Sequence, residues 1–348
     1  MEPIIIAKEH LVETTELFTS GRDGYRSYRI PALVVTSTGT ALAFCEARRH
    51  TGHDDDEIDI VLRRSFDGGQ TWEAHQMVVS DGNRTCGNPC PVVDHDTGAV
   101  HLVFCKDNQQ VFVCRSEDDG ETWTTPVEIT STVKDPSWSY LGTGPGHGIQ
   151  LSGGRLLIPS WTDESSGPVT WRDPQPNWNE AQSSYAFFSD DHGETWRRGA
   201  KMTHDASDEC EAVETSHGAV YMNMRSRHER HRRAFAWSRD GGETWSDVEH
   251  DPSLPEPSCQ GSIVRFDADR VLLSNPSQTD RRAELTIRVS YDECRTWPVA
   301  RVLDPGMASY SELAVTGDGR ILCFYEPNEG YGRLALSRFG IEWLENQA

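Results

Sequence analysis

The sequence contains no apolar run long enough to cross a membrane. A spanning helix needs about 18 or more consecutive apolar residues, whereas the apolar run near the N-terminus is only Ile4-Ile5-Ile6. That run is also too short for the core of a secretory signal, and Glu2 precedes it where such signals carry Lys or Arg. We therefore expect no membrane span, and a cytoplasmic location for the chain as given.

Positive charge is scarce as well. The 348 residues include 33 Lys and Arg against 55 Asp and Glu, which gives a net charge of −22. A protein that binds nucleic acid or an anionic membrane presents a basic face. The composition therefore argues against both kinds of partner.

Several common catalytic and cofactor motifs are missing. The sequence has no GxxxxGK[ST], GxGxxG, HExxH or GxSxG pattern. The nine cysteines are odd in number and scattered, and the closest pair, Cys86 and Cys90, has no second pair at metal-binding spacing. We expect these cysteines to be mostly reduced and partly buried, and we expect neither a metal nor a cofactor.

What the sequence does contain is a recurring octet, Ser-x-Asp-x-Gly-x-Thr-Trp. Five copies begin at Ser65, Ser116, Ser189, Ser238 and Ser290, and the fifth carries Cys294 where Gly is expected. The interval is about 50 residues with one longer gap, a period typical of propellers and other repeat folds. Ser, Asp and Gly favour tight turns, and the alternating residues before each octet predict a strand.

Each repeat contains four short strand-like runs, and a sixth unit spanning 311–337 follows without an octet. The fourth strand of that unit is either missing or supplied by the N-terminal segment 15–19. We therefore predict an all-β fold, a six-bladed β-propeller of four-stranded antiparallel blades, as a single domain over 1–348. The long interval between the octets at Ser116 and Ser189 predicts a loop insertion over 163–182. A β-sandwich or a β-helix is the alternative.

Strand alternation also predicts which face of the propeller carries chemistry. Each octet lies in the turn between the third and fourth strands, so all octets share one face. The unusual polar residues fall in positions that belong to the opposite face, with Glu209 and Tyr310 in connections between blades. The set is Arg29, Arg48, Asp54, Glu209, Arg225, Arg282, Tyr310 and Glu326. Arginines converging from different blades suit bidentate recognition of a carboxylate.

These residues carry a resemblance to a known family. Tyr28-Arg29-Ile30-Pro31 matches an Arg-Ile-Pro motif, the octets match Asp boxes, and Gly144-Pro145-Gly146-His147-Gly148 matches a family loop. Glu46-Ala47-Arg48 with Thr51-Gly52-His53-Asp54 matches a further segment. The chain resembles, over residues 25–343, the exo-α-sialidases (neuraminidases) of glycoside hydrolase family 33, which include bacterial and mammalian enzymes.

The resemblance implies a role for each matching residue. Arg29, Arg225 and Arg282 would grip the carboxylate of the sugar. Tyr310 would be the nucleophile and Glu209 its base, and Asp54 would be the acid/base.

Two further residues would support this set. Glu326 would orient Arg29, and Arg48 would contact the carboxylate or neighbouring ring substituents. Asp54 is chosen from the run Asp54–Asp56 by its Thr-Gly-x-Asp context, and Glu214 is the less favoured substitute for Glu209.

The expected function is hydrolysis of terminal α-linked sialic acid from sialylated glycans, with retention of configuration and without a cofactor. The same chemistry on KDN or another nonulosonic acid is one alternative. A non-catalytic propeller that binds sialylated glycans or a protein partner is the other.

Overall fold

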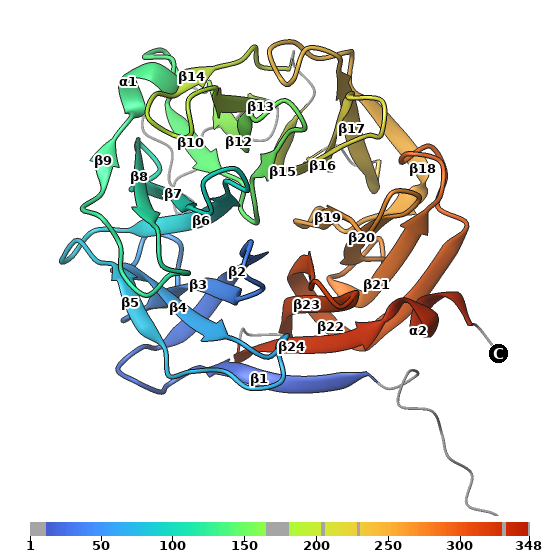
Figure 1. Cartoon of the computed structure of the whole chain (residues 1–348), viewed down its shortest axis with the longest axis horizontal. Coiled ribbons are helices and arrows are strands. Elements are labelled where there is room, and N and C mark those ends of the chain that lie inside the picture. Colours follow the sequence, from blue (N-terminus) through green and yellow to red (C-terminus); the bar gives the residue numbers. More distant parts are fainter. Residues whose placement is uncertain (1–11, 165–180, 203–205, 228–229, 329–331, 347–348) are drawn as a thin grey trace, which may run out of the picture.

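The computed structural model describes residues 12–164, 181–202, 206–227, 230–328 and 332–346, and these residues form an almost entirely β structure. The strands assemble into antiparallel sheets placed around a common centre (Figure 1). None of the described helices is long and apolar enough to cross a bilayer. The two that are present are α1 (Thr130–Val133) and α2 (Ile341–Glu345).

Three sheets have four strands each, joined in chain order. The first consists of β2 (Ser27–Val35), β3 (Ala41–Arg48), β4 (Ile58–Ser65) and β5 (Gln76–Val79). The second consists of β6 (Cys86–Val93), β7 (Val100–Lys106), β8 (Gln110–Ser116) and β9 (Val127–Glu128). The third consists of β15 (Ser207–Glu214), β16 (Val220–Ser226), β17 (Arg232–Ser238) and β18 (Glu249–Pro255). These sheets confirm the predicted four-stranded antiparallel unit.

A five-stranded sheet differs from the predicted pattern at its inner strand. It consists of β10 (Tyr140–Thr143), β11 (Ile149–Gln150), β12 (Leu156–Asp163), β13 (Gln182–Ser189) and β14 (Arg197–Arg198). Two short strands, β10 and β11, both pair with β12 and share the position of a single inner strand. Glycines and a proline between them break the strand. Most of the predicted insertion over 163–182 lies outside the described residues.

The remaining strands form one seven-stranded sheet in the order β1-β24-β23-β22-β21-β20-β19. Its members are β1 (Glu13–Thr19), β19 (Ser262–Arg265), β20 (Val271–Pro276), β21 (Ala283–Ser290), β22 (Val299–Val315), β23 (Arg320–Pro327) and β24 (Arg333–Gly340). The long β22 pairs with β21 through its first part, up to Met307, and with β23 from Ala308 onward. One strand therefore links two groups of strands.

The N-terminal strand completes this sheet. β1 pairs antiparallel with β24, with Glu13 opposite Arg338 and Thr19 opposite Arg333. The first and last strands of the chain therefore lie side by side (Figure 1). The predicted use of the N-terminal segment as the fourth strand of the last unit is confirmed.

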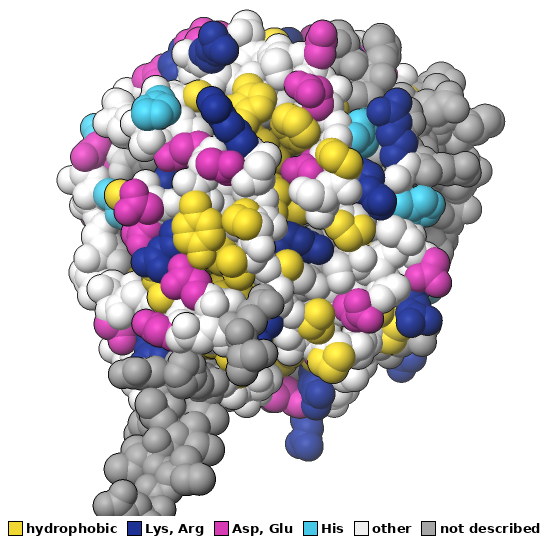
Figure 2. All heavy atoms as spheres, turned by 90° about the vertical axis from the view of Figure 1, so that its right-hand side faces the viewer, with side chains coloured by type: hydrophobic (Ala, Val, Ile, Leu, Met, Phe, Trp, Pro, Cys, Tyr) yellow, Lys and Arg dark blue, Asp and Glu magenta, His cyan; other side chains and the backbone are white. Residues whose placement is uncertain are grey.

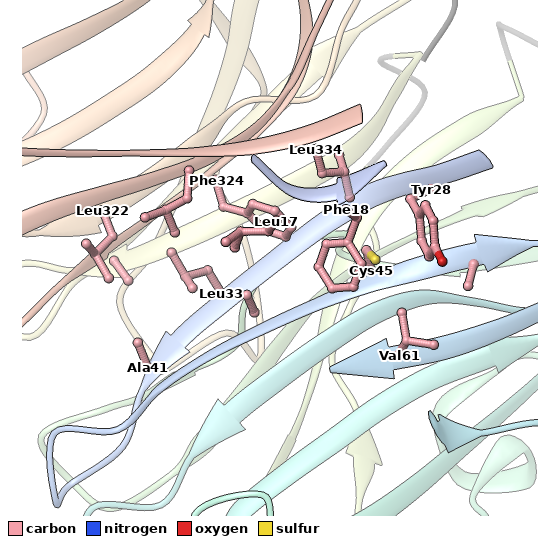
Figure 3. Packing of buried hydrophobic residues seen from close by; sticks show 14 of the residues in the cluster. Leu17, Phe18, Tyr28, Leu33, Ala41, Cys45, Val61, Leu322, Phe324 and Leu334 are labelled. Carbon is pink, nitrogen blue, oxygen red and sulfur yellow. The ribbon is translucent and has the colours of Figure 1, made fainter. Parts of the chain in front are cut away.

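Side chains from β1 anchor this closure. Leu17 and Phe18 pack with Tyr28 of β2 and with Leu334 and Phe324 of the last strands (Figure 3). Burying two large apolar side chains of this kind stabilises the fold by about 3–6 kcal/mol. The N-terminal strand is thus part of the hydrophobic core.

The octets form the predicted turns. In the first copy, Ser65 Oγ accepts the N–H of Gly69 at 2.9 Å, and Asp67 accepts the N–H of Thr71 at 2.9 Å. The Trp72 indole N–H donates to the Gly69 carbonyl at 3.2 Å. The fifth copy keeps the Ser and Asp contacts: Cys294 adopts the left-handed φ of +66° and donates its N–H to Ser290 at 2.9 Å, and Asp292 accepts the N–H of Thr296 at 2.8 Å.

Strand register places the octets and Arg29 at opposite ends of the first sheet. Val35 pairs with Ala41, and Ala41 pairs with Ser65, where the octet begins. Arg29 pairs instead with Glu46, near the other end of both strands. The predicted segregation of the two faces is confirmed in this sheet.

Charges of both signs mix on the outer surface despite the net negative charge (Figure 2). Side-chain pairs such as Arg155 with Asp190 at 2.7 Å bring them together.

All nine cysteines are free and buried, so the expectation of unpaired thiols is confirmed and their burial is more complete than predicted.

We predict that Asp67→Ala lowers the free energy of unfolding by about 1–2 kcal/mol, because Asp67 accepts several hydrogen bonds within its octet. Burial raises the pKa of Asp67, but these hydrogen bonds outweigh it and hold the pKa at about 2. The contribution of Asp67 should therefore be complete above pH ~4 and decline as the pH falls toward ~2. Thermal unfolding across this range would measure it. Glu194→Ala, an exposed octet change, should have little effect at any pH, and equal losses in both variants would contradict the prediction.

Candidate active site

Tyr310 and Glu209 form a hydrogen-bonded pair in the middle of the predicted site. The Tyr310 hydroxyl donates to Glu209 Oε1, and Arg225 Nη1 donates both to Glu209 Oε2 at 2.6 Å and to Tyr310 Oη at 3.2 Å. All three side chains are buried, at 5–7% exposure. A phenol, a carboxylate and a guanidinium thus contact one another, although they come from three strands, β22, β15 and β16.

Arg29 is held in place by Glu326. Its Nε and Nη2 atoms donate to the two carboxylate oxygens of Glu326 at 3.1 and 3.2 Å. Glu326 also accepts the backbone N–H groups of Ile30 at 2.9 Å and Tyr310 at 3.4 Å. This two-point contact fixes the plane of the guanidinium, and the predicted orienting contact between Glu326 and Arg29 is present.

Arg282 brings the third guanidinium to the same ring. Its carbon Cζ lies 5.5 Å from the centre of the Tyr310 ring, and that of Arg29 lies 5.1 Å from it. Arg282 donates to Ser309 Oγ at 3.1 Å and to the Ser258 carbonyl at 3.3 Å. The three predicted arginines therefore surround Tyr310.

Asp54 and Arg48 form the other side of the cluster. Asp54 Oδ1 lies 2.7 Å from Arg48 Nη1 and 3.5 Å from Arg29 Nη1, and the Asp54 side chain is 55% exposed. Arg48 is buried and also donates to the Gly52 carbonyl at 2.9 Å. The exposed carboxylate thus lies at the solvent side of a buried set of arginines.

Glu46 has a role that the sequence did not reveal. It binds Arg48 through Nε at 3.0 Å and Nη2 at 2.5 Å, and it accepts the Asn88 N–H at 2.8 Å. Alternate residues of a strand share a face. The two-residue spacing from Glu46 to Arg48 could therefore have predicted their contact. Asp56, the neighbour of Asp54, is instead used locally, because it accepts the N–H groups of His50, Thr51 and Gly52.

The inner strands carry an irregularity at the level of the site. Register shifts occur in β2 between Arg29 and Ala32, in β15 between Ser207 and Cys210, and in β22 between Ala308 and Ser311. Bulges of this kind re-aim side chains and are common beside active sites. Glu209 and Tyr310 lie within the shifted segments, so their predicted placement in connections between blades was wrong.

The protein environment shifts the pKa of Tyr310 and the pKa of Asp54 in opposite directions. Burial, and next the Glu209 carboxylate, raise the pKa of Tyr310 well above its usual value, against the effect of the arginines. Burial raises the pKa of Asp54, but Arg48 and Arg29 outweigh it and the net shift is downward. Tyr310 is therefore a neutral phenol at neutral pH, whereas Asp54 is an anion in the free protein.

Two large cavities lie away from this cluster. One of about 1240 Å³ is lined by Trp237, Trp245 and Trp297, and one of about 530 Å³ is lined by Val35 and His147 among others. None of the eight predicted site residues lines either cavity. The site is therefore defined by the contacts among its side chains and not by either cavity.

Two groups of His, Asp and Glu side chains among the described residues come within reach of a shared cation, and neither includes a predicted site residue. Asp94, Asp96 and His192 form the more exposed group. In the buried group, formed by His147, Glu211 and Glu312, His147 hydrogen-bonds Glu312 directly.

Known proteins resemble this chain over most of its length. A model of the BNR repeat-like domain matches residues 39–323. A sialidase from Micromonospora viridifaciens is 33% identical over 98% of this chain and 56% of its own length. An exo-alpha-sialidase from Aspergillus fumigatus is 30% identical over 93% of this chain and 86% of its own length.

The chain belongs to the sialidase family. A solved Hadza microbial sialidase superposes with a TM-score of 0.84 at 29% identity, over 95% of this chain and 69% of the other. The chain spans just over half of the Micromonospora sialidase, so that relative contains additional sequence.

We predict that Arg225→Lys lowers kcat/KM for a sialoside by at least ~10-fold. A lysine keeps the charge but has one donor nitrogen, so it cannot replace both Nη1, which contacts Glu209 and Tyr310, and Nε, which contacts Ser258. Initial rates and the melting temperature should be measured for both variants. The matched control is Arg227→Lys, which alters a neighbouring contact to Asp208 at 2.6 Å and should spare activity. A variant at Arg225 that unfolds readily yet keeps its specific activity would contradict a role in binding or chemistry.

Proposed function

We propose that this protein is an exo-α-sialidase that hydrolyses terminal α-linked sialic acid from glycans with retention of configuration. The observation that supports this proposal most directly is the hydrogen bond from Tyr310 to Glu209 within the set of three arginines. Tyr310 acts as nucleophile, Glu209 as its base and Asp54 as acid/base.

The arginines define the substrate. Arg29, Arg225 and Arg282 lie around one face of the cluster, and arginine is the residue best suited to grip a carboxylate at two points. Sialic acids carry such a carboxylate on the anomeric carbon itself. Binding that group therefore places the reacting carbon beside Tyr310.

A tyrosine nucleophile suits an anionic substrate. Most glycosidases use a carboxylate, and sialidases with tyrosine are a recognised exception. Two negative charges 4 Å apart repel by about 1 kcal/mol in water and by about 4 kcal/mol at an effective dielectric constant near 20. A neutral Tyr310 that passes its proton to Glu209 avoids most of this repulsion.

The proton steps balance over two half-reactions. In the first, Tyr310 Oη attacks the anomeric carbon while Glu209 takes the phenolic proton, and Asp54 donates a proton to the departing glycosidic oxygen. In the second, Asp54 accepts a proton from water, water attacks the anomeric carbon, and Glu209 returns its proton to Tyr310. The enzyme ends in its starting state, and sialic acid is released with its original configuration.

Substrate binding supplies a reason for Asp54 to hold a proton. In the free protein Asp54 lies 3.5 Å from Arg29 and 2.7 Å from Arg48, and these charges lower its pKa. A bound carboxylate would engage Arg29 and add a negative charge nearby. Both changes raise the pKa of Asp54 toward the protonated form that a general acid needs.

The same site would process related sugars that share the carboxylate. KDN and other nonulosonic acids are the alternative substrates, and a fluorogenic panel that includes Neu5Ac and KDN would rank them. A non-catalytic glycan-binding protein is the further alternative, and cleavage of any member of that panel excludes it. A cytoplasmic location stays a prediction.

We also infer a six-bladed propeller. The seven-stranded sheet divides within β22, where pairing passes from β21 to β23 at Ala308. Counting the two parts as separate blades gives four strands to each, with β1 as the outer strand of the last. An experimental structure in which β22 runs straight through one flat sheet would contradict this count.

We predict that Tyr310→Phe loses most hydrolytic activity but still binds sialic acid, because the three arginines remain. The wild-type protein should release the α-anomer first, and NMR at early times would observe it. Calorimetric titration of the variant with sialic acid tests the retained binding. Initial release of the β-anomer would contradict a covalent intermediate on Tyr310.

We predict that Asp54→Ala loses activity selectively. The loss should be severe, ~100-fold or more, on natural glycans, whose leaving oxygen needs a proton. It should be milder on an aryl sialoside, whose phenolate departs without one. Rates on both substrates would test this, with Asp55→Ala as the matched control. Equal losses on the two substrates would exclude Asp54 as the acid.

A further inference from the structure

A second buried cluster lies next to the catalytic couple. His147, Glu211 and Glu312 come from the loop after β10, from β15 and from β22, which belong to three different sheets. His147 Nδ1 hydrogen-bonds Glu312 Oε1 and lies 3.5 Å from Glu211 Oε2. The exposure of Glu211 and Glu312 is 0%. One imidazole thus joins two carboxylates that the solvent does not reach.

This cluster uses the same two strands as the catalytic pair. Glu211 follows Glu209 by two residues on β15, and Glu312 follows Tyr310 by two residues on β22. Two residues of extended chain span at most about 7 Å, whichever way the shifted segments at Glu209 and Tyr310 turn their side chains. The second pair therefore lies one step along the strands from the first.

The backbone around the cluster leaves little freedom for movement. Glu211 Oε2 accepts the N–H of Ile263 on β19 at 2.9 Å. A Cβ added to Gly146 would lie 1.8 Å from Glu211 Oε1 and 2.7 Å from Glu312 Oε2, so only glycine fits beside the two carboxylates. The cluster is packed against its loop, and a displacement of either strand would disturb it.

We propose that His147 is a positioning residue, which ties Glu211 and Glu312 together beside the catalytic couple and thereby sets the separation of Glu209 and Tyr310. This inference rests on the proposed roles of Tyr310 and Glu209. The two strands bring the Glu211 and Glu312 carboxyl groups together, and Gln260 Nε2, at 3.4 Å, and the Ile263 N–H donate to Glu211 alone. Two buried carboxylates repel each other unless a proton and a hydrogen-bond donor lie between them.

The charge of the cluster is consistent with this role. Burial raises the pKa of Glu312 to about 8, and burial together with the Glu312 carboxylate raises the pKa of Glu211 well above its usual value. Cys90, Cys210 and Cys323 are the neighbouring thiols, and burial raises the pKa of each. These thiols are therefore neutral at neutral pH and add no charge to the cluster.

The first test is a kinetic comparison of three variants of the whole chain. His147→Ala should lower kcat by ~10-fold to ~100-fold, because a displacement of about 1 Å in a reacting group costs rate on this scale. KM should change by less than about 2-fold, since the arginines are not touched. His147→Asn keeps an N–H near the position of Nδ1 and should restore part of the rate. His95→Ala is the matched control, because His95 lines the same 530 Å³ cavity as His147 but contacts Ser37 instead of a carboxylate.

Glu312→Gln provides a second readout that does not depend on activity. In the folded protein Glu312 binds a proton up to pH ~8, whereas in the unfolded chain it releases it near pH ~4.5. Wild-type stability should therefore fall as the pH rises from ~4.5 to ~8, and the glutamine variant should lack this part of the decline. Melting temperatures of both proteins from pH 5 to 8 would measure it. Equal slopes would show that Glu312 does not hold the proton.

The outcomes separate this inference from the proposed function. If Tyr310→Phe is inactive while His147→Ala keeps kcat within about 2-fold of wild type, the positioning role is wrong and the proposed chemistry stands. If Tyr310→Phe is fully active, the proposed chemistry itself is wrong. A rise in KM alone for His147→Ala would assign His147 to substrate binding instead. One equivalent of a divalent metal in the purified wild type, lost in His147→Ala, would also overturn the proton-sharing arrangement.

Discussion

The antiparallel pairing of β1 with β24 is the interaction on which the rest of the structure depends. It joins the N-terminal strand to the last sheet and buries Leu17 and Phe18 between β2 and the C-terminal strands. The site residues come from β2, β3, β15, β16, β22 and β23 and from two loops, which are far apart in the chain. Their contacts exist only because the sheets are held around one centre. Arg29 near the beginning of the chain reaches Glu326 near its end for this reason.

Balanced burial of charge organises the catalytic face. Arg225 lies against Glu209, Arg29 against Glu326, and Arg48 against Glu46 and Asp54. A buried charge without a partner is strongly destabilising, so each of these arginines requires an acid. The pairing also limits what the site can bind, because the acids hold the guanidiniums in fixed planes. The result is a rigid group of donors around a neutral tyrosine, which suits a substrate that brings its own carboxylate.

Much of the fold was predictable from local pattern. The octets identify turns because Ser, Asp and Gly satisfy backbone groups within eight residues, and the structure shows those hydrogen bonds around Ser65 and Asp67. The alternation before each octet predicted the third strands well. The division of the inner strand of the five-stranded sheet into β10 and β11 was not predictable in the same way. The loop between them contains Gly146, where a side chain would meet Glu211, which lies more than sixty residues later in the chain.

The sequence by itself determined the repeat, the sign of the net charge and the segregation of the first octet from Arg29, and the family motifs nominated the candidate site residues. Only the tertiary structure decided that Glu209 and Tyr310 lie in bulged strands, that Glu46 holds Arg48, and that His147 bridges Glu211 and Glu312. The physical reason is the distance along the chain over which each interaction acts. Turn chemistry and strand alternation act over a few residues and leave a direct pattern. A bulge, a buried ion pair or a shared proton depends on which strands become neighbours, and that is settled only when the sheets pack together.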